Sequence, residues 1–341
     1  MTTAHRILII GDSYMKAELF ETALRQRGLD SDSHTVNIVD EPRWTVDGLR
    51  EFEGDPAEID GFLDGHDIVA FHGAPISAQL LEANPQIRLL ACARGGPVNV
   101  DIEAAFARGI KITTTPGKNA EAVADLTLGF LIQLLRNVPA ASADVGEKAT
   151  SGRTLAESAF EGAKWFGREL SGFKLGLVGY GNVAKLVAKR ALALGMQVYT
   201  FDPYATPDVG GLVSVVGTLE ELLEKVDAVS LHARATAENR HLFGASQFAA
   251  MSEGSVFINT ARESLVDENA LLAALNSGHL AGVAMDVNEP DGPWRDLVAH
   301  PNLILTPHIA GATQETLVRG ASMLADEIAA YINGKPMRWS M

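Results

Sequence analysis

Residues Phe173–Pro203 read FKLGLVGYGNVAKLVAKRALALGMQVYTFDP. The apolar run Lys174–Val178 is typical of a buried parallel strand, and the residues after it carry apolar side chains at helical intervals. Gly179, Gly181 and Ala184 lie between these segments at the spacing G-x-G-x-x-A. Glycine permits a tight turn and a close backbone approach, and alanine permits close packing of helix on strand. The stretch therefore predicts a nucleotide-binding strand–helix–strand unit.

The second strand of this unit indicates which nucleotide binds. The run Gln197–Phe201 ends at Asp202, about 20 residues after the turn, where a carboxylate can accept hydrogen bonds from an adenosine ribose. An acidic side chain there disfavours the 2′-phosphate of NADP, so the sequence predicts NAD, with its pyrophosphate at the helix N-terminus. Turns that bind no nucleotide also use glycines, so the prediction depends on the flanking elements and Asp202.

Composition narrows the class of protein. With 341 residues the chain is long for one core, so we expect two domains. The 28 basic and 43 acidic residues give a net charge of −15, which argues against a nucleic-acid or anionic-membrane partner. The N-terminal apolar run is too short for a signal peptide and no stretch has the length of a membrane span, so a cytoplasmic location is expected. The single cysteine, Cys92, excludes an intrachain disulfide and a cysteine-based zinc cluster, and no metal site is predicted.

The part of the chain before the glycine turn reads as a small α/β domain that begins with a strand at Arg6–Ile10. Its loop Arg94–Asn99 follows a strand, at the end where open α/β sheets place ligands. Arg94 offers a guanidinium fork for a carboxylate, while Gly95 and Gly96 expose backbone N–H groups. We predict that these three residues bind substrate, and the alternative is a rigid surface turn.

The sequence Gly11-Asp12-Ser13 also occurs in a family of serine hydrolases, which makes Ser13 a candidate nucleophile. Asp12 and Ser13 are also ordinary N-cap residues, and a helix is expected over Lys16–Arg27. We favour the capping interpretation.

Three ionisable side chains follow strands in the second half of the chain, where strands and helices alternate as in a doubly wound parallel sheet. Arg262 follows VFINTA, Glu289 follows GVAMDVN, and His308 follows LILTP. The carboxyl ends of parallel strands meet at one edge, so we expect the three to converge on a ligand crevice. A long apolar helix over Glu121–Val138 and a polar, turn-like stretch over Ala140–Leu170 precede this sheet.

The three side chains supply the proton donor and the substrate-binding cation that a nicotinamide cofactor does not provide. Hydride transfer to a carbonyl leaves an alkoxide that needs a proton, and an imidazolium such as His308 is the usual donor near neutral pH. A carboxylate such as Glu289 orients a neighbouring imidazole, and Arg262 can anchor a substrate carboxylate and polarise the carbonyl. Taken singly, His308 could be a cap or core residue, Glu289 a loop acid and Arg262 part of a surface ion pair. Their shared placement after strands favours catalysis.

Several motifs together resemble a known family. GLVGYGNVAKLVAKRALALGMQVYTFDP, VSLH, INTARESLVDENALLAAL, AMDV with Glu289-Pro290, and LTPHIAGAT are similar to successive motifs of the D-isomer-specific 2-hydroxyacid dehydrogenases. That family includes phosphoglycerate, glycerate and D-lactate dehydrogenases. The resemblance covers most of the chain and implies two doubly wound parallel-sheet domains. Residues 117–308 would form a Rossmann-type NAD domain, and residues 1–116 with 309–341 a flavodoxin-like substrate domain.

The resemblance also implies residue roles. Arg262 would bind substrate, Glu289 would support the base, and His308 would move the proton. The implied cofactor contacts are the pyrophosphate cradle of Gly179, Gly181, Asn182 and Val183, the ribose ligand Asp202, and the lining residues His232, Thr260 and Asp286. A homodimer formed through the cofactor domains is expected.

The chain departs from the family pattern in the loop that follows Asp286. The loop is about two residues short, so counting back from His308 selects Glu289 as the paired carboxylate, whereas counting forward from Asp286 selects Asp291. We prefer Glu289 because it keeps the Glu-Pro pair. A glutamate here, where formate-oxidising members carry glutamine, speaks against formate as the substrate.

Two further departures concern the substrate. RGGPVN stands where many members have G-V-G-x-D-N, and Arg234 stands where proline is usual after VSLH. The extra cations suit a second anionic group, such as a phosphate or distal carboxylate. The leading hypothesis is an NAD-dependent enzyme that interconverts a 2-oxo acid and a D-2-hydroxy acid, with a sugar acid or its phosphate as one suitable substrate class. An NAD(H)-sensing regulatory protein, like the co-repressors related to this family, is the alternative, and a hydrolase that uses Ser13 is the third.

Overall fold

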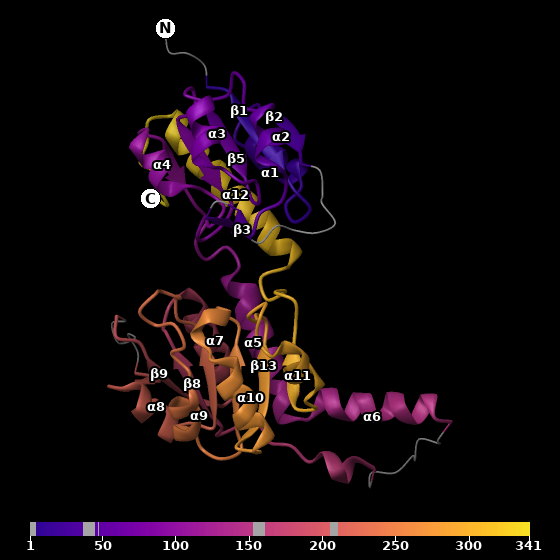
Figure 1. Ribbon diagram of the computed structural model, residues 1–341. Helices are drawn as coiled ribbons and strands as arrows, with labels where there is room; N and C mark the ends of the chain where they lie inside the picture. Colours follow the sequence, from indigo (N-terminus) through magenta and orange to yellow (C-terminus); the bar gives the residue numbers. More distant parts are fainter. Residues whose placement is uncertain (1–4, 37–44, 47, 153–160, 205–210) are drawn as a thin grey trace. The chain divides into compact units, whose positions relative to one another are not determined.

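The computed structural model describes residues 5–36, 45–46, 48–152, 161–204 and 211–341. The chain forms two compact units (Figure 1). Unit 1 consists of Met1–Lys118 with Thr313–Met341, and unit 2 consists of Asn119–Ala312.

Unit 1 is built on a five-stranded parallel sheet with the strand order β2-β1-β5-β6-β7. This is the flavodoxin-like order, in which the chain reverses direction beside its first strand. The strands are β1 (Ile7–Gly11), β2 (Asp32–Thr35), β5 (Ile68–Phe71), β6 (Leu89–Cys92) and β7 (Lys111–Thr113), and β3 (Thr45–Val46) with β4 (Leu49–Arg50) forms a separate hairpin. The helices are α1 (Ala17–Arg25), α2 (Pro56–Asp60), α3 (Ala78–Ala83), α4 (Ile102–Ala107) and α12 (Gln314–Ile332).

Both faces of this sheet are covered by helices, which explains why β1, β5 and β6 are buried throughout. Successive side chains of a strand point to opposite faces. Leu8 and Ile10 pack with residues of α2 and α3, whereas Ile7 and Ile9 pack with residues of α1 and α12. The C-terminal helix α12 thus completes the core of the N-terminal segment.

Unit 2 contains a seven-stranded parallel sheet with the order β10-β9-β8-β11-β12-β13-β14. The order reverses beside β8, which is where doubly wound sheets bind dinucleotides. Its strands are β8 (Lys174–Val178), β9 (Gln197–Phe201), β10 (Val213–Val215), β11 (Ala228–Leu231), β12 (Ser255–Asn259), β13 (Leu280–Met285) and β14 (Leu303–Leu305). Its helices are α5 (Ala120–Leu135), α6 (Val138–Thr150), α7 (Asn182–Ala193), α8 (Leu219–Lys225), α9 (Ala245–Ala250), α10 (Glu268–Asn276) and α11 (Trp294–Ala299), with 3₁₀ turns at Glu161–Trp165 and Glu263–Leu265.

The segment before the sheet of unit 2 differs from the expectation. The apolar helix α5 ends at Leu135, and a separate helix, α6, follows Asn137, whose φ of 52° is left-handed. The interpretation of Ala140 onward as turn-like was therefore wrong over α6. No residue of α6 is buried, so its sequence carries no apolar period that could indicate a helix. In Figure 1, α6 extends away from the sheet of its unit.

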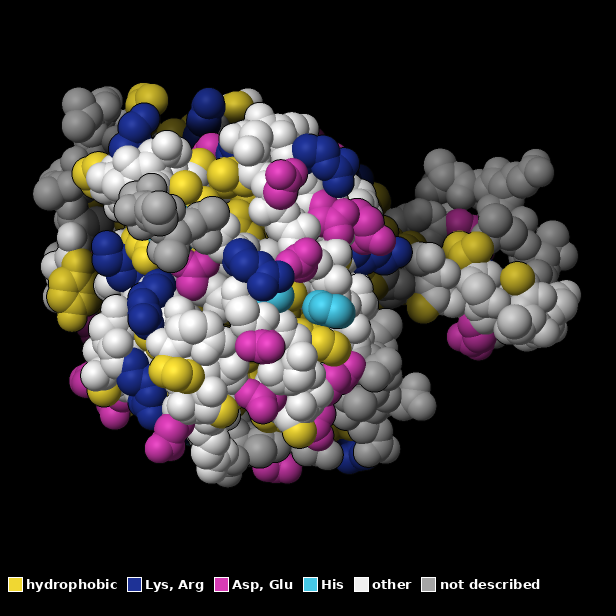
Figure 2. Space-filling model, turned by 90° about the horizontal axis from the view of Figure 1, so that it is seen from above, with side chains coloured by type: hydrophobic (Ala, Val, Ile, Leu, Met, Phe, Trp, Pro, Cys, Tyr) yellow, Lys and Arg dark blue, Asp and Glu magenta, His cyan; other side chains and the backbone are white. Residues whose placement is uncertain are grey.

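The predicted class, two doubly wound parallel-sheet α/β domains with one of Rossmann type, is confirmed. None of the described helices combines the length and the apolar character that crossing a membrane requires. The face seen in Figure 2 carries both basic and acidic side chains.

Candidate cofactor and active site

The two glycines of the β8–α7 turn are required for different physical reasons. Gly179 has a φ of +89°, and a β-carbon there would lie 2.7 Å from the backbone nitrogen of Ala233, just beyond β11. Gly181 has an ordinary φ of −82°, and a β-carbon there would meet nothing within 4 Å. Gly181 is the N-cap of α7 and no side chain caps that helix. The first amides of α7 and the open space at Gly181 therefore fit a pyrophosphate group.

Asp202, directly after β9, is tied to this turn. Its Oδ2 accepts a hydrogen bond from the backbone N–H of Tyr180 (2.7 Å) and its Oδ1 accepts one from Tyr204 (2.8 Å). A carboxylate has about four lone-pair sites, so Asp202 retains acceptors for a ribose. Asn182 and Val183 are the first two residues of α7.

His232 and Thr260 follow the neighbouring strands β11 and β12. Nε2 of His232 lies 3.0 Å from Oγ of Ser230, and burial lowers the pKa of His232 to about 3, so this imidazole is neutral. The hydroxyl of Thr260 lies 3.2 Å from that of Thr127 on α5. Both side chains are thus fixed from within unit 2 at the carboxyl edge of its sheet.

Asp286, directly after β13, holds the turn that carries His308. Only 1% of Asp286 is exposed. Its Oδ1 accepts hydrogen bonds from the Thr306 hydroxyl (2.5 Å) and the Ile309 N–H (2.8 Å), and its Oδ2 accepts one from the Ala310 N–H (2.7 Å). Its carbonyl accepts the N–H of His308 (3.0 Å), which has a left-handed φ of 56°. A buried carboxylate therefore fixes the backbone on both sides of an exposed imidazole.

Arg262, Glu289 and His308 follow three adjacent strands, β12, β13 and β14. Arg262 is exposed and donates to the carbonyl of Ala261 (2.7 Å). Oε1 of Glu289 pairs instead with Nη2 of Arg240 (3.1 Å). Among the described residues there is no recorded hydrogen bond between Glu289 and His308, so the pairing of base and carboxylate stays a prediction. Nor does any recorded contact decide between Glu289 and Asp291.

Glu268 supports this loop and was missed by sequence reasoning. It opens α10, only 4% of it is exposed, and its Oε1 accepts the N–H of Glu289 (2.7 Å). Burial raises the pKa of Glu268. The side chain could not be found from sequence because a glutamate in the first turn of a helix is usually a solvated residue.

Arg94, Gly95 and Gly96 lie in unit 1, in the loop after β6. The guanidinium of Arg94 is already engaged: Nη1 donates to Oε2 of Glu51 (2.9 Å), Nη2 to the carbonyl of Glu51 (2.5 Å), and Nε to the carbonyl of His72 (3.1 Å). Gly95 and Gly96 are exposed. The predicted fork for a carboxylate is therefore held by the protein's own groups.

Asp12 does not cap α1, so that interpretation was wrong, and the residue at the cap is Lys16. The carboxylate of Asp12 is 2% exposed and accepts the N–H groups of Met15 (2.6 Å) and Gly73 (2.6 Å). Its Oδ2 also lies 3.3 Å from Nδ1 of His72. His72 directly follows β5, and the strand-end rule applied to the second half of the chain would have found it.

The two candidate nucleophiles of unit 1 are not arranged for catalysis. The hydroxyl of Ser13 donates to the carboxylate of Glu53 (2.6 Å), with no histidine recorded as its partner among the described residues. Cys92 is fully buried, and burial raises its pKa to about 12. A thiol of this kind stays protonated and unreactive.

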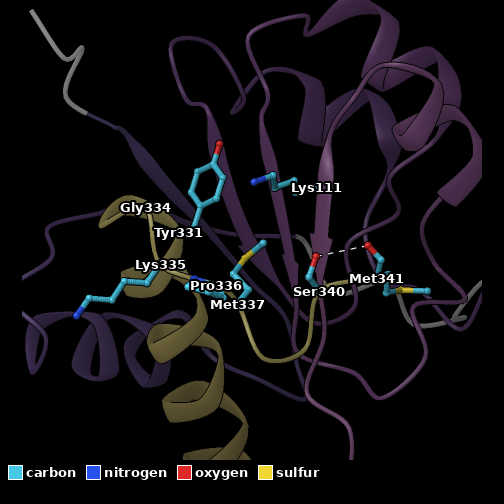
Figure 3. Close-up of a pocket in the computed structure, with 8 residues that line it drawn as sticks. All are labelled: Lys111, Tyr331, Gly334, Lys335, Pro336, Met337, Ser340 and Met341. Atoms are coloured by element: carbon cyan, nitrogen blue, oxygen red, sulfur yellow. Dashed lines mark hydrogen bonds between the residues drawn. The ribbon is translucent and has the colours of Figure 1, made fainter.

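A surface cavity of about 540 Å³ lies elsewhere in unit 1, along the outermost strand β7 (Figure 3). Figure 3 shows Lys111 and Tyr331 with the C-terminal residues around it, and Nζ of Lys111 lies 5.3 Å from the centre of the Tyr331 ring. Lys111 is at the amino end of β7, so this hollow is separate from the carboxyl ends of the strands, which carry the ionisable side chains.

The fold and the glycine turn define a dinucleotide-binding protein of the Rossmann class. A family model described as "D-isomer specific 2-hydroxyacid dehydrogenase, NAD binding domain" matches residues 128–310. A glyoxylate reductase of Korarchaeum cryptofilum is 35% identical over 280 residues, 81% of this chain and 82% of that protein. A D-3-phosphoglycerate dehydrogenase of Methanocaldococcus jannaschii is 31% identical over 280 residues, 81% of this chain, which spans about half (52%) of that longer protein.

A solved structure agrees with these relatives. The TT0316 protein of Thermus thermophilus superimposes with a TM-score of 0.78 at 31% identity, and the match covers 98% of this chain and 99% of that one. The chain belongs to the D-isomer specific 2-hydroxyacid dehydrogenase family, and its unit 2 contains the family's NAD-binding domain.

Proposed function

We propose that this protein is an NAD-dependent D-2-hydroxyacid dehydrogenase that interconverts a 2-oxo acid and a D-2-hydroxy acid. The observation that carries the proposal is the set of hydrogen bonds from Asp286 to the turn of His308, beside the strands that carry Arg262 and Glu289. A general acid must be held in a fixed orientation to act, and a buried carboxylate provides that orientation.

The proposed mechanism assigns one task to each side chain. Bound NADH supplies the hydride that reduces the carbonyl carbon of the substrate. Arg262 binds the substrate carboxylate through charge-assisted hydrogen bonds. His308 gives its proton to the carbonyl oxygen in reduction and removes it in oxidation, and Glu289 orients the imidazole.

In this proposal the cofactor is held by unit 2, which corresponds to the domain expected over residues 117–308. Gly179, Gly181, Asn182 and Val183 would hold the pyrophosphate, Asp202 would bind the ribose, and His232, Thr260 and Asp286 would line the dinucleotide. Open space at Gly181 and the uncapped start of α7 support this assignment. The segments 1–116 and 309–341 form the substrate domain, in which Gly95 and Gly96 offer backbone N–H groups and Arg94 supports the loop.

The test is a panel of 2-oxo acids assayed with NADH, using the wild type and His308→Gln. Loss of a general acid typically costs about 10²- to 10⁴-fold in kcat, while the dissociation constant of NADH, read by its fluorescence, should stay within about threefold. Turnover that survives in His308→Gln would refute the proton-transfer role. Tight NADH binding without turnover of any acid by the wild type would favour the sensing alternative, which the enzyme names of the reported relatives do not support.

We further propose a homodimer formed through unit 2, in the cytoplasm. The helix α6 supports a dimer because none of its residues is buried, and Val138 and Val145 on it are 44% and 45% exposed. Phe166, farther along the same segment, is 85% exposed. Light scattering after size exclusion should give twice the chain mass of 36.3 kDa, and Val145→Asp should lower it towards one chain mass. A wild-type monomer would refute the proposal.

A further inference from the structure

The loop that carries Glu289 is a tight turn attached to α10. Residues 289–292 read Glu-Pro-Asp-Gly, and the N–H of Gly292 donates to the carbonyl of Glu289 (3.0 Å), which closes the turn. Proline is favoured at the second position of such a turn because its φ is already set. Oε1 of Glu268, at the start of α10, accepts the N–H of Glu289 (2.7 Å). The turn is therefore closed on itself and bound to a helix at its first residue.

The same carboxyl group also meets the last residue of the turn. A β-carbon at Gly292 would overlap Oε2 of Glu268, so the glycine leaves the space that the carboxyl group occupies. The φ of Gly292 lies outside the left-handed region, so the backbone conformation alone does not require glycine. One carboxyl group thus contacts both ends of the turn, Glu289 by a hydrogen bond and Gly292 by packing.

Glu268 is needed neither as a helix cap nor for the stability of the fold. The N-cap of α10 is Asp267, whose Oδ1 accepts the N–H groups of Asn269 (3.0 Å) and Ala270 (3.2 Å). Glu268 is 4% exposed, and within the described part of the chain its Oε2 has no recorded hydrogen-bond partner. Burial raises the pKa of Glu268 because it penalises the charged form. A buried acid with an unpaired oxygen destabilises the fold, which points to a role in positioning.

The contact that the side chain of Glu289 makes is weaker than this attachment. Its Oε1 pairs with Nη2 of Arg240 (3.1 Å), and the two side chains are 29% and 56% exposed. An exposed ion pair contributes little because water screens it. The buried hydrogen bond to Glu268 therefore decides where the turn lies, and the carboxylate of Glu289 can exchange Arg240 for another partner.

We propose that Glu268 is a positioning residue, whose carboxyl group fixes the turn of Glu289 so that Glu289 can orient His308. The inference rests on the proposed function, in which Glu289 pairs with His308. All three residues belong to unit 2. Glu268 acts on the reaction only through Glu289.

The kinetic test compares Glu268→Ala with Glu268→Gln in turnover of the preferred 2-oxo acid. Alanine removes the acceptor of the Glu289 N–H, so kcat should fall about tenfold or more because the carboxylate beside the general acid is no longer held. Glutamine keeps a carbonyl oxygen as acceptor and should retain kcat within about threefold of the wild type. In both variants the KM of the 2-oxo acid and the dissociation constant of NADH should stay within about threefold.

Two double variants separate positioning from a general weakening of the fold. Glu268→Ala combined with Glu289→Gln should be no slower than Glu289→Gln alone, because Glu268 acts through Glu289. Gly292→Ala tests the same contact with the carboxyl group in place: its β-carbon displaces that group, so kcat should fall, but much less so in the Glu268→Ala background. Asn269→Ala, which changes the exposed next residue of α10, should leave kcat unchanged. Losses that multiply in either double variant would overturn the inference while leaving the proposed dehydrogenase intact.

Hydrogen exchange followed by NMR tests the attachment without turnover. The amide of Glu289 should exchange about tenfold or more faster in Glu268→Ala than in the wild type, because its hydrogen bond is lost. In Glu268→Gln and Asn269→Ala the rate should stay within about threefold of the wild type. An unchanged rate in Glu268→Ala would overturn the inference, whether or not any 2-oxo acid is reduced. A wild type that reduces no 2-oxo acid, with an amide that exchanges faster in Glu268→Ala, would refute the proposed function and leave the attachment of the turn intact.

Discussion

Replacing Asp286 with alanine should destabilise unit 2 and disorder the turn of His308. The substitution removes the acceptor of the buried Ala310 N–H and of the Ile309 N–H, and the Thr306 hydroxyl can rotate to another partner. Each backbone N–H that is left unsatisfied costs about 1–3 kcal/mol, so the free energy of unfolding should fall by about 2–6 kcal/mol. That is a large share of the roughly 5–15 kcal/mol typical of a domain.

Asp286→Asn separates positioning from stability. Its amide oxygen can still accept from Thr306 and Ile309, but its NH₂ group faces the Ala310 N–H, so about 1–3 kcal/mol is lost and the domain should remain folded at 25 °C. Because the backbone beside His308 is no longer held from both sides, kcat should fall about tenfold or more while NADH still binds.

The measurements are urea unfolding followed by fluorescence, and steady-state turnover of the preferred 2-oxo acid. Asp291→Asn, which changes an exposed carboxylate in the following loop, serves as the control and should leave the urea midpoint in place. If Asp286→Ala unfolded at the wild-type urea midpoint, the hydrogen bonds from the turn to Asp286 would not contribute the expected loss of about 2–6 kcal/mol to the free energy of unfolding. If Asp286→Asn kept full kcat but bound NADH more weakly, the residue would act on the dinucleotide instead.

Three further predictions concern the glycine turn, Asp202 and Lys118. Gly179→Ala should lower the urea midpoint, because Gly179 has a φ of +89° and a β-carbon there would lie 2.7 Å from the backbone of Ala233. Gly181→Ala should leave the urea midpoint unchanged and weaken NADH binding, because a β-carbon there would meet only open space. Equal effects of the two substitutions on the urea midpoint would contradict this assignment. Asp202→Ser should raise kcat/KM for NADPH relative to NADH, because it removes the charge that repels a 2′-phosphate, and an unchanged ratio would refute the role of the carboxylate. Lys118 has a folded pKa of about 8 against 10.5 for an ordinary lysine, so between these values the unfolded chain binds the additional proton. The free energy of unfolding of the wild type should therefore rise with pH across this window relative to Lys118→Met, and a constant difference between urea melts at about pH 7 and about pH 9.5 would contradict the shift.

The parallel sheets could be predicted because their strands are short apolar runs bounded by turn residues. β8, β11 and β12 are buried on both faces, and a strand of that kind has a sequence unlike its surroundings. α6 could not be predicted because it buries nothing, so no period in its sequence distinguishes it from a polar loop.

The placement of the site residues at one edge of the sheet could also be predicted, because the carboxyl ends of parallel strands lie at the same edge whatever the side chains are. Their contacts could not. Asp286 was expected to line the dinucleotide, and its carboxylate accepts three hydrogen bonds from the turn of His308. Glu289 was expected beside His308, and its recorded partner is Arg240. Which acceptor meets which donor depends on a few ångströms of backbone, and the residue type does not encode that.

Arg94 and Lys118 show the same limit in the assignment of charge. As a sequence feature, Arg94 was the more attractive anion ligand, because a guanidinium beside two glycines suits a carboxylate. In the folded chain Glu51 neutralises it, and the cation left unpaired among the described residues of this edge is Lys118, which in sequence is an ordinary lysine after a Pro-Gly turn. A cation count from the sequence therefore does not tell which of these cations the fold neutralises, and only the folded chain shows that Arg94 is the one paired with a carboxylate.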